Sequence, residues 1–317
     1  MSEASPHFPV MLPEVLEALS PAAGEVYVDC TLGAGGYTRA ILSAEKSCNV
    51  IAFDRDQTAH DMAVKWSADF EGRLTLVKNS FANLEEELAN IGIAKVDAVI
   101  LDLGVSSMQF DQGERGFSFR FDAPLDMRMD RDSGETAADI VNTMEEKELA
   151  DMIYLYGEER KSRQIASAIV RKRAEQKIET TFQLADIIRT VVPPSWKDKS
   201  DPATRTFQAL RIAVNEELLE LETVLQAAEN VLKENGRLIV VTFHSLEDRI
   251  VKNFLNERSK PAPSPSRHMP IMAVDSVTHR LSFSLASKKP VLPSEKEIKI
   301  NPRSRSAKMR VGIRRAA

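Results

Sequence analysis

Long hydrophobic runs and cysteines are scarce in this chain of 317 residues. No apolar run approaches the ~18 residues that a membrane-spanning helix needs, and residues 1–6 lack the basic and apolar regions of a secretory signal. We therefore expect a cytoplasmic protein without a membrane partner. The two cysteines, Cys30 and Cys48, offer neither a disulfide framework nor the ligand spacing of a metal site, so we expect buried thiols and no metal.

Glycine and proline are also modest in number, at 13 and 15, which excludes collagen-like and low-complexity chains. Hydrophobic residues at 43% and charged residues at 28% are typical of a globular protein. The length suits about two domains of roughly 150 residues each.

Charge is unevenly distributed around the net value of -5. Residues 250–317 contain 15 Lys and Arg against 4 Asp and Glu, a net charge of +11, which leaves -16 for residues 1–249. A basic end suits a polyanion, because each neutralised phosphate releases condensed counterions. The alternative is a solvated surface with no ligand.

Four short apolar runs, at residues 26–30, 50–53, 74–77 and 96–101, alternate with helical patterns that start near Tyr37, Gln57 and Phe81. This order predicts a doubly wound α/β layer with a parallel sheet and right-handed crossovers. The next strand is expected only at residues 238–243, after a helix that Gly236 ends. Residues 281–285 and 309–313 are expected to add antiparallel strands, and residues 259–270 to form a proline-rich connector.

The late fifth strand indicates an insertion. We predict a discontinuous α/β domain at residues 1–112 and 216–317, interrupted by a helical domain at residues 113–215. Apolar residues recur at helical spacing from Leu184 to Val191, and the same spacing continues from Leu210 to Leu232. Asp201 and Pro202 are expected to cap and begin a helix.

A glycine loop, Thr31 to Gly36, follows the first strand, and Asp54 ends the second strand 21 residues after Gly33. A carboxylate at that place accepts hydrogen bonds from both ribose hydroxyls, which predicts a nucleoside cofactor. Thr38 stands where a dinucleotide fingerprint needs its third glycine, which favours a cofactor without a pyrophosphate. A glycine turn without any ligand is the alternative.

Asp102 ends the fourth strand, at the edge where open α/β sheets bind ligands. A cap or turn role is the alternative for this side chain. The loop at residues 109–130 carries Phe117, Phe119 and Phe121 at alternate positions, which are typical of packing, although a loop beside a ligand edge can also act as a lid.

Several longer blocks occur in order along the chain: residues 7–12, the glycine loop, 101–107, 114–119, 124–130, 156–160, 202–211 and 242–249. They include Glu-Arg-Gly-Phe-Ser-Phe at 114–119, Pro-Leu-Asp-Met-Arg-Met-Asp at 124–130 and Thr-Phe-His-Ser-Leu-Glu-Asp-Arg at 242–249. Together they resemble the RsmH, or MraW, family of ribosomal small-subunit RNA cytosine-N4 methyltransferases.

The resemblance implies a class I, Rossmann-like methyltransferase sheet with an inserted helical subdomain that recognises substrate. It also implies N4-methylation of a decoding-centre cytosine in 16S rRNA of the small ribosomal subunit, with S-adenosyl-L-methionine as cofactor and no DNA partner. The family's cofactor contacts map onto Gly35, Gly36, Tyr37, Asp54, Phe81, Asp102 and Gln109. The family often has histidine at the position of Tyr37, but backbone contacts there do not depend on the side chain.

For that reaction, the N4 amine is a poor nucleophile because its lone pair is delocalised into the ring. Asp102, or a backbone carbonyl near Leu103, is placed by sequence to accept its N–H, which makes Asp102 the candidate catalytic residue. The reaction requires neither a metal nor a covalent intermediate. The sequence lacks a cysteine nucleophile in a motif, which argues against methylation at ring carbon C5.

The remaining polar motifs concern caps and RNA contacts. His244 either contacts substrate or binds neighbouring loops, and Ser245 with Asp248 predicts a capping box. A flipped-out target base suggests a structured RNA particle as substrate. Two basic sets are candidates for RNA binding: Arg160, Lys161, Arg163, Arg171, Lys172 and Arg173 with Thr204, Arg205 and Arg211 in the insert, and Arg303, Arg305, Lys308, Arg310, Arg314 and Arg315 near the end.

Two other functions compete with this one. A nicotinamide dehydrogenase is disfavoured by Thr38 but is separable only by cofactor binding. An RNA-binding assembly factor with the same fold would bind substrate without turnover.

Overall fold

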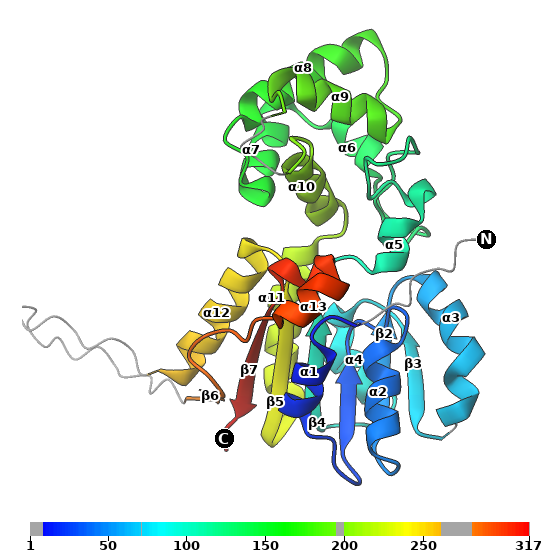
Figure 1. Ribbon diagram of the computed structural model, residues 1–317, viewed down its shortest axis with the longest axis vertical. Helices are drawn as coiled ribbons and strands as arrows, with labels where there is room; N and C mark the ends of the chain where they lie inside the picture. Colours follow the sequence, from blue (N-terminus) through cyan, green and yellow to red (C-terminus); the bar gives the residue numbers. More distant parts are fainter. Residues whose placement is uncertain (1–8, 71, 195–199, 261–280, 317) are drawn as a thin grey trace, which may run out of the picture. The chain divides into compact units, whose positions relative to one another are not determined.

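The computed structural model describes residues 9–70, 72–194, 200–260 and 281–316, traced in Figure 1. The chain divides into two compact units. The first consists of Met1–Gly104 with Glu220–Ala317, and the second of Val105–Leu219. The predicted insert at residues 113–215 lies inside the second unit.

A seven-stranded sheet in the order β3-β2-β1-β4-β5-β7-β6 forms the centre of the first unit. The first five strands in chain order are parallel, whereas β7 is antiparallel to β5 and to β6. The predicted doubly wound sheet and its antiparallel closing strands are therefore confirmed. The bounds are β1 Val26–Asp29, β2 Asn49–Asp54, β3 Leu74–Lys78, β4 Val96–Asp102, β5 Leu232–Thr242, β6 Phe283–Leu285 and β7 Lys308–Arg314.

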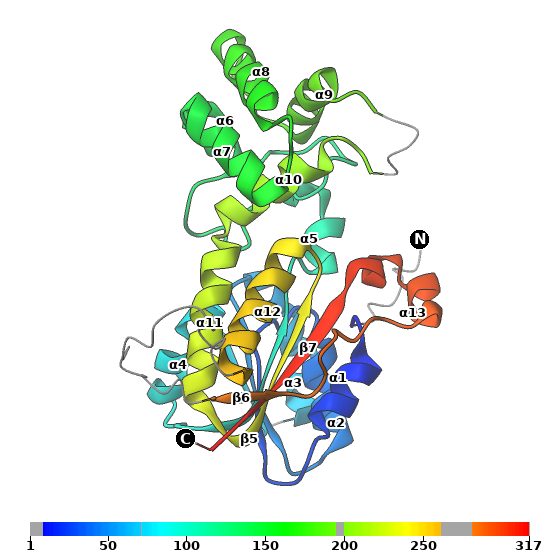
Figure 2. The ribbon, with the colours of Figure 1, turned by 90° about the vertical axis from the view of Figure 1, so that its left-hand side faces the viewer.

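Helices cover both faces of this sheet, with α1, α2 and α3 on one face and α4, α11 and α12 on the other (Figures 1 and 2). Burial on both faces explains why the strands are nearly uniformly apolar, as in Ala98 to Leu101, which are fully buried. The helices are α1 Leu12–Leu19, α2 Gly36–Ala44, α3 Gln57–Ser67, α4 Leu84–Asn90, α11 Glu217–Val231, α12 Ser245–Ser259 and α13 Glu295–Ile300, with 3-10 turns η1 Ala68–Phe70, η2 Phe81–Asn83 and η4 Pro302–Ser306.

The start of β5 differs from the prediction. The strand begins at Leu232, directly after α11, so Gly236 lies within the strand and does not end the helix. The pairing register between β4 and β5 shifts between Val96 and Ala98 of β4. On the β5 side of this shift, Asn235 takes a left-handed φ of 64°. A Cβ at Gly236 would lie 2.8 Å from the carbonyl oxygen of Lys233. A residue without a Cβ is therefore needed at this irregular part of the strand.

The second unit is helical and has its own hydrophobic core, which includes Ile153, Ile169, Leu184 and Leu210 and shares no residue with the core of the sheet. Of the loop aromatics, Phe117 is buried and Phe119 packs edge-on against Phe207, as the packing interpretation predicts, but Phe121 is 55% exposed, contrary to it. The elements are α5 Ser107–Asp111, η3 Gly113–Arg115, α6 Ala137–Thr143, α7 Glu146–Gly157, α8 Ser162–Glu175, α9 Thr181–Val191 and α10 Thr204–Val214.

Two helix boundaries near the end of this unit correct the sequence interpretation. The spacing from Leu210 to Leu232 spans two helices, because Glu216 takes a left-handed φ of 49° between α10 and α11. The predicted helix start at Pro202 is also wrong, since α10 begins at Thr204. The carboxylate of Asp201 accepts the N–H of Ala203 at 2.8 Å and holds a turn before the helix.

Most of the predicted connector at residues 259–270 lies outside the described residues. Within the described ranges, every helix is too short or too polar to cross a bilayer. Cys30 and Cys48 are buried and free, as predicted.

Candidate cofactor site

The glycine loop between β1 and α2 is confined between two bulky side chains. Gly35 has a left-handed φ of 80°, and a Cβ there would lie 2.2 Å from the Trp66 ring. A Cβ at Gly36 would lie 2.3 Å from the ring of Pro9. Only glycine fits both positions, and it leaves the backbone at the N-terminus of α2 free of side chains.

Asp54 lies against this loop, as the spacing predicts. Its Oδ2 atom accepts the N–H of Gly33 at 2.9 Å, and its Oδ1 atom accepts the N–H of Asp56 at 2.9 Å. Burial raises the pKa of Asp54 to about 6, against the hydrogen bonds, which lower it. The end of β2 thus carries a carboxyl group that is held in place by the loop.

Asp102 ends β4 at the same edge of the sheet, since β1 lies between β2 and β4. Its backbone N–H donates to Thr31 Oγ1 at 2.9 Å. Its side-chain Oδ1 is buried and has no hydrogen-bond partner among the described residues. Burial, followed by the charge of Asp29, raises the pKa of Asp102 well above its usual range. A buried oxygen without a partner is costly, and in the part of the chain that the structure describes no cap or turn bond from this oxygen supports the structural alternative.

Asp29 is a buried acidic residue beside the glycine loop that the sequence interpretation did not identify. It is fully buried at the end of β1, where Oδ2 accepts the hydroxyl of Thr38 at 2.7 Å and Oδ1 accepts the N–H of Thr31 at 3.1 Å. Burial raises its pKa. Thr38 therefore anchors a buried carboxyl group at the place where a dinucleotide site has glycine. The available signal was an acidic residue in an apolar strand directly before a glycine loop.

The side chain of Tyr37 points into the protein. It is buried, and its hydroxyl donates to the backbone carbonyl of Val10. The N–H of the next residue, Met11, donates to Glu297 Oε1 at 2.8 Å. The tyrosine thus binds the segment before α1, and only its backbone at the start of α2 remains for a ligand.

The last two predicted cofactor residues lie in different units. Phe81 begins η2 after β3 and packs against the core of the sheet. Gln109 belongs to α5 in the second unit, where it is buried and its Oε1 accepts the N–H of Ser106 at 3.0 Å.

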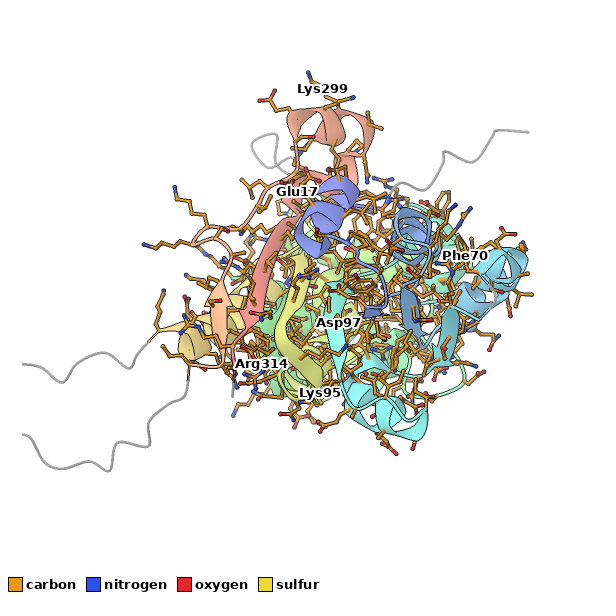
Figure 3. The ribbon with its side chains drawn as sticks, turned by 90° about the horizontal axis from the view of Figure 1, so that it is seen from below. Glu17, Phe70, Lys95, Asp97, Lys299 and Arg314 are labelled. Carbon is orange, nitrogen blue, oxygen red and sulfur yellow. The ribbon has the colours of Figure 1, made fainter. Side chains whose placement is uncertain are left out.

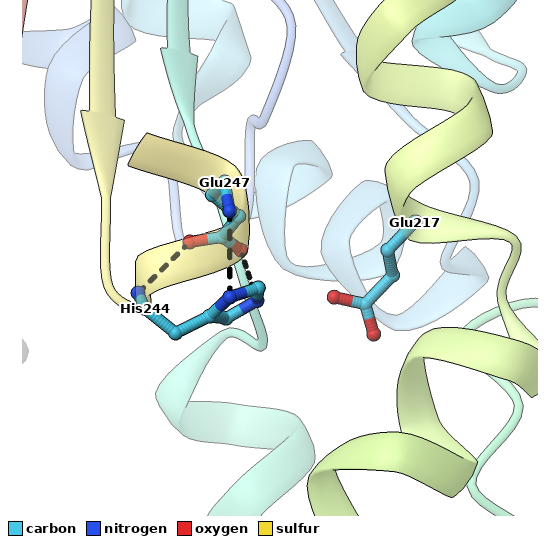
Figure 4. A group of neighbouring side chains, drawn as sticks. All are labelled: Glu217, His244 and Glu247. Carbon is cyan, nitrogen blue, oxygen red and sulfur yellow. Dashed lines mark hydrogen bonds and ion pairs between the residues drawn. The ribbon is translucent and has the colours of Figure 1, made fainter. Parts of the chain in front are cut away.

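His244 is the N-cap of α12, one residue before the predicted cap at Ser245 (Figure 4). Its Nδ1 accepts the N–H of Glu247 at 3.5 Å, and the carboxylate of Glu247 accepts the N–H groups of Phe243 and His244 at 2.7 and 3.2 Å. The imidazole Nε2 lies 3.1 Å from the same carboxylate, in poor hydrogen-bond geometry. This supports the loop-binding interpretation of His244.

The predicted partner of the cap, Asp248, instead pairs with Arg310 at 2.7 Å and Lys308 at 3.3 Å. Other candidate RNA-binding cations also have partners within the protein. Arg211 forms a two-point pair with Glu217, and Arg173 donates to the carbonyls of Val141 and Met144. These side chains serve the fold.

Comparison with known proteins agrees with the motifs. Residues 4–315 match the model of the MraW methylase family. Proteins named Ribosomal RNA small subunit methyltransferase H include relatives from Rhodospirillum rubrum, 53% identical over 98% of this chain and 94% of its own length, and from Caulobacter vibrioides, 54% identical over 98% and 96%. A relative of that name from Rhodopseudomonas palustris is 55% identical over 96% and 89%.

The family match and the seven-stranded sheet together confirm the predicted fold, a class I methyltransferase sheet with an inserted helical subdomain. The chain belongs to the MraW methylase family.

Proposed function

We propose that this protein transfers a methyl group from S-adenosylmethionine to N4 of a decoding-centre cytosine in 16S rRNA of the small ribosomal subunit. The family and the names of the relatives support the reaction class and the RNA. The single observation that carries the chemistry is the unpartnered Oδ1 of Asp102 at the carboxyl edge of the sheet, among the residues that the structure describes. The reaction belongs in the cytoplasm, where the subunits are.

The residues at this edge fit the proposed cofactor. Asp54 offers carboxylate oxygens to the ribose hydroxyls, and the backbone of Gly35, Gly36 and Tyr37 lets the amino-acid part of the cofactor approach closely. Phe81 and Asp102, both in the first unit, would complete these contacts, whereas Gln109 belongs to the second unit and stays a prediction from the sequence. When bound, S-adenosylmethionine supplies an electrophilic methyl group on its sulfonium.

Asp102 acts on the amine. As the nitrogen attacks, its lone pair leaves the ring and its N–H becomes more acidic. A C–N bond forms, the C–S bond breaks, and one proton leaves N4. In its ionised form, the carboxyl group accepts that N–H at the buried Oδ1 and then takes the proton. Holding the amine in line with the methyl group supplies much of the remaining acceleration.

The test is methyl transfer from labelled S-adenosylmethionine to small subunits from cells that lack this protein, followed by nucleoside analysis of the RNA. We expect label in N4-methylcytidine, and we expect Asp102→Ala to lower kcat by about 10²-fold or more. Cofactor binding without any label would favour an assembly factor or another acceptor. Absence of cofactor binding would contradict the cofactor itself.

A further inference from the structure

The cations of the C-terminal segment fall into two sets. Those on β7 are used by the fold: Lys308 and Arg310 pair with Asp248, and Arg314 donates to the backbone carbonyls of Ser282 and Glu229. These side chains are therefore poor candidates for binding a polyanion, although the sequence alone places them with the others.

A second set lies immediately before β7. Lys296 and Lys299, three residues apart in α13, and Arg305 in η4 are exposed, and none forms an ion pair or side-chain hydrogen bond with the described residues. Figure 3 shows Lys299 pointing away from the body of the protein. We call Lys296, Lys299 and Arg305 the α13–η4 cationic surface.

Little negative charge opposes this surface within its own segment. Glu295 and Glu297 are the acids among residues 286–306, and Glu297 is occupied by the N–H of Met11. Lys288 and Lys289 add two more exposed cations. Lys296, Lys299 and Arg305 thus lack the partners that the β7 cations have among the described residues.

The cationic surface borders the candidate cofactor site. Because β7 is antiparallel, Lys308 pairs with Thr242 at the end of β5, so η4 lies at the carboxyl edge where β2 and β4 present Asp54 and Asp102. The bond from Met11 to Glu297 fastens α13 to the segment that binds Tyr37. Figures 1 and 2 both show α13 beside α1 at this edge.

We propose that the α13–η4 cationic surface binds phosphates of the substrate RNA that flank the target nucleotide. This rests on the proposed function and names a binding surface for it. Cations without an internal partner gain most from binding a polyanion, because they break no existing ion pair. The release of counterions from each phosphate then favours binding in full. Ile300 and Leu292, 62% and 61% exposed, add apolar area beside the charges for the faces of unstacked nucleotides.

The test measures RNA affinity against salt concentration for wild type and for K296Q/K299Q/R305Q, with small subunits or a 16S rRNA fragment as probe. We expect the slope of log affinity against log salt to fall by about 2–3, at roughly 0.7–0.9 per lost phosphate contact. KM for subunits should rise while kcat and S-adenosylmethionine affinity stay unchanged.

A matched control removes the same charge elsewhere. Lys46, Lys65 and Lys252 are exposed and have no ion pair with the described residues, so K46Q/K65Q/K252Q should keep the wild-type slope. If the slope fell equally in both triple variants, the effect would be one of net charge and the proposal would be overturned. An unchanged slope in K296Q/K299Q/R305Q would also overturn it. Binding to phosphatidylglycerol vesicles that matches RNA binding would replace RNA by a membrane surface. Because RNA affinity is measured without turnover, a loss of methyl transfer alone leaves the surface standing and contradicts only the proposed function.

Discussion

At the scale of single residues, Gly35 has almost no room for a side chain in the glycine loop. Its left-handed φ of 80° and the Trp66 ring, which would lie 2.2 Å from an added Cβ, penalise any substitution twice. Gly24 separates the two effects, because its φ is 75° but nothing lies within 4 Å of a Cβ there. We predict that Gly24→Ala lowers the free energy of unfolding by about 1–2 kcal/mol.

Gly35→Ala should cost a further 1–3 kcal/mol or so, because Trp66 must move. Denaturant unfolding of both variants gives the comparison. Equal losses would mean that the indole moves aside without cost and that the loop is not confined by it.

The raised pKa of Asp54 predicts a pH dependence for cofactor binding. Ribose hydroxyls donate to the ionised carboxylate, and with a pKa of about 6 only about one molecule in ten is ionised at pH 5. We expect S-adenosylmethionine affinity to be roughly tenfold weaker at pH 5 than at pH 7.5 by calorimetry. A flat profile over that range would contradict the role of Asp54.

The same pKa shift also changes the folding stability of the ligand-free protein with pH, in the opposite direction to its effect on cofactor binding. The folded pKa is raised from 3.8, so without ligand the folded state binds more protons than the unfolded state between about pH 4 and 6. Stability from this group is therefore present below pH 4 and is lost as pH rises through 6. Asp54→Asn has no carboxyl group to titrate, so its stability should not fall between pH 4 and 6. If this variant is folded but binds S-adenosylmethionine weakly, the defect lies in binding and not in folding.

The sequence predicts Asp54 and Asp102 because a strand end followed by a turn is visible in the residue pattern. It does not predict Asp29, because an acidic residue inside an apolar run gives no sign of the threonine hydroxyl that holds it. It also places the cap of α12 at Ser245, since serine caps helices well by itself. The actual choice depends on Glu247, which binds the N–H groups of both Phe243 and His244.

At the scale of elements, Asp248 joins α12 to β7 through Arg310 and Lys308. Burial alone would raise the pKa of Asp248, but the hydrogen bond and charge of Arg310 outweigh it and lower the pKa. A lowered pKa stabilises the fold above the unfolded value near 4, and this contribution is lost as pH falls below it. We predict that Asp248→Asn costs about 1–3 kcal/mol at pH 7 and progressively less as pH falls below the unfolded pKa near 4.

The control is Glu257→Gln in the same helix, where the carboxylate is 72% exposed and lies 3.7 Å from Arg258. Such a pair should contribute less than about 0.5 kcal/mol at any pH. Urea unfolding at several pH values checks both variants. A pH-independent loss in Asp248→Asn would show that packing, not charge, connects the two elements.

Element boundaries show where sequence patterns stop being informative. Helical spacing continues through Asn215, yet the helix ends there because the Asn215 side chain binds the backbone of Met127 and Met129, almost ninety residues earlier. The irregular start of β5 depends on Asn235 and on pairing with β4, which lies before the second unit in the chain. Such contacts join residues that are far apart in the chain, so they produce no periodic pattern in the local sequence.

At the scale of the whole molecule, the two hydrophobic cores share no residue. A core of its own is what an independently folding unit needs. We predict that a fragment of residues 105–219 folds alone, with helical circular dichroism and a single cooperative thermal transition. Gradual melting of the fragment without a transition would contradict this.

The parallel, doubly wound character of the first half of the sheet follows from the β–α alternation and the handedness of crossovers. The edges of the insertion do not, because they fall within a loop and a helix with ordinary composition. The second unit begins at Val105, and the boundary at its other end lies inside α11.

The separation of β4 from β5 along the chain has a consequence for synthesis on the ribosome. About 130 residues lie between Asp102 and Leu232, which takes roughly 6–26 s at 5–20 residues per second. During this interval the apolar edge of β4 has no neighbouring strand on the side that β5 later occupies. An open strand edge of this kind invites pairing with other chains. We therefore expect the nascent protein to need protection, from a chaperone or from early folding of the second unit, before its sheet is complete.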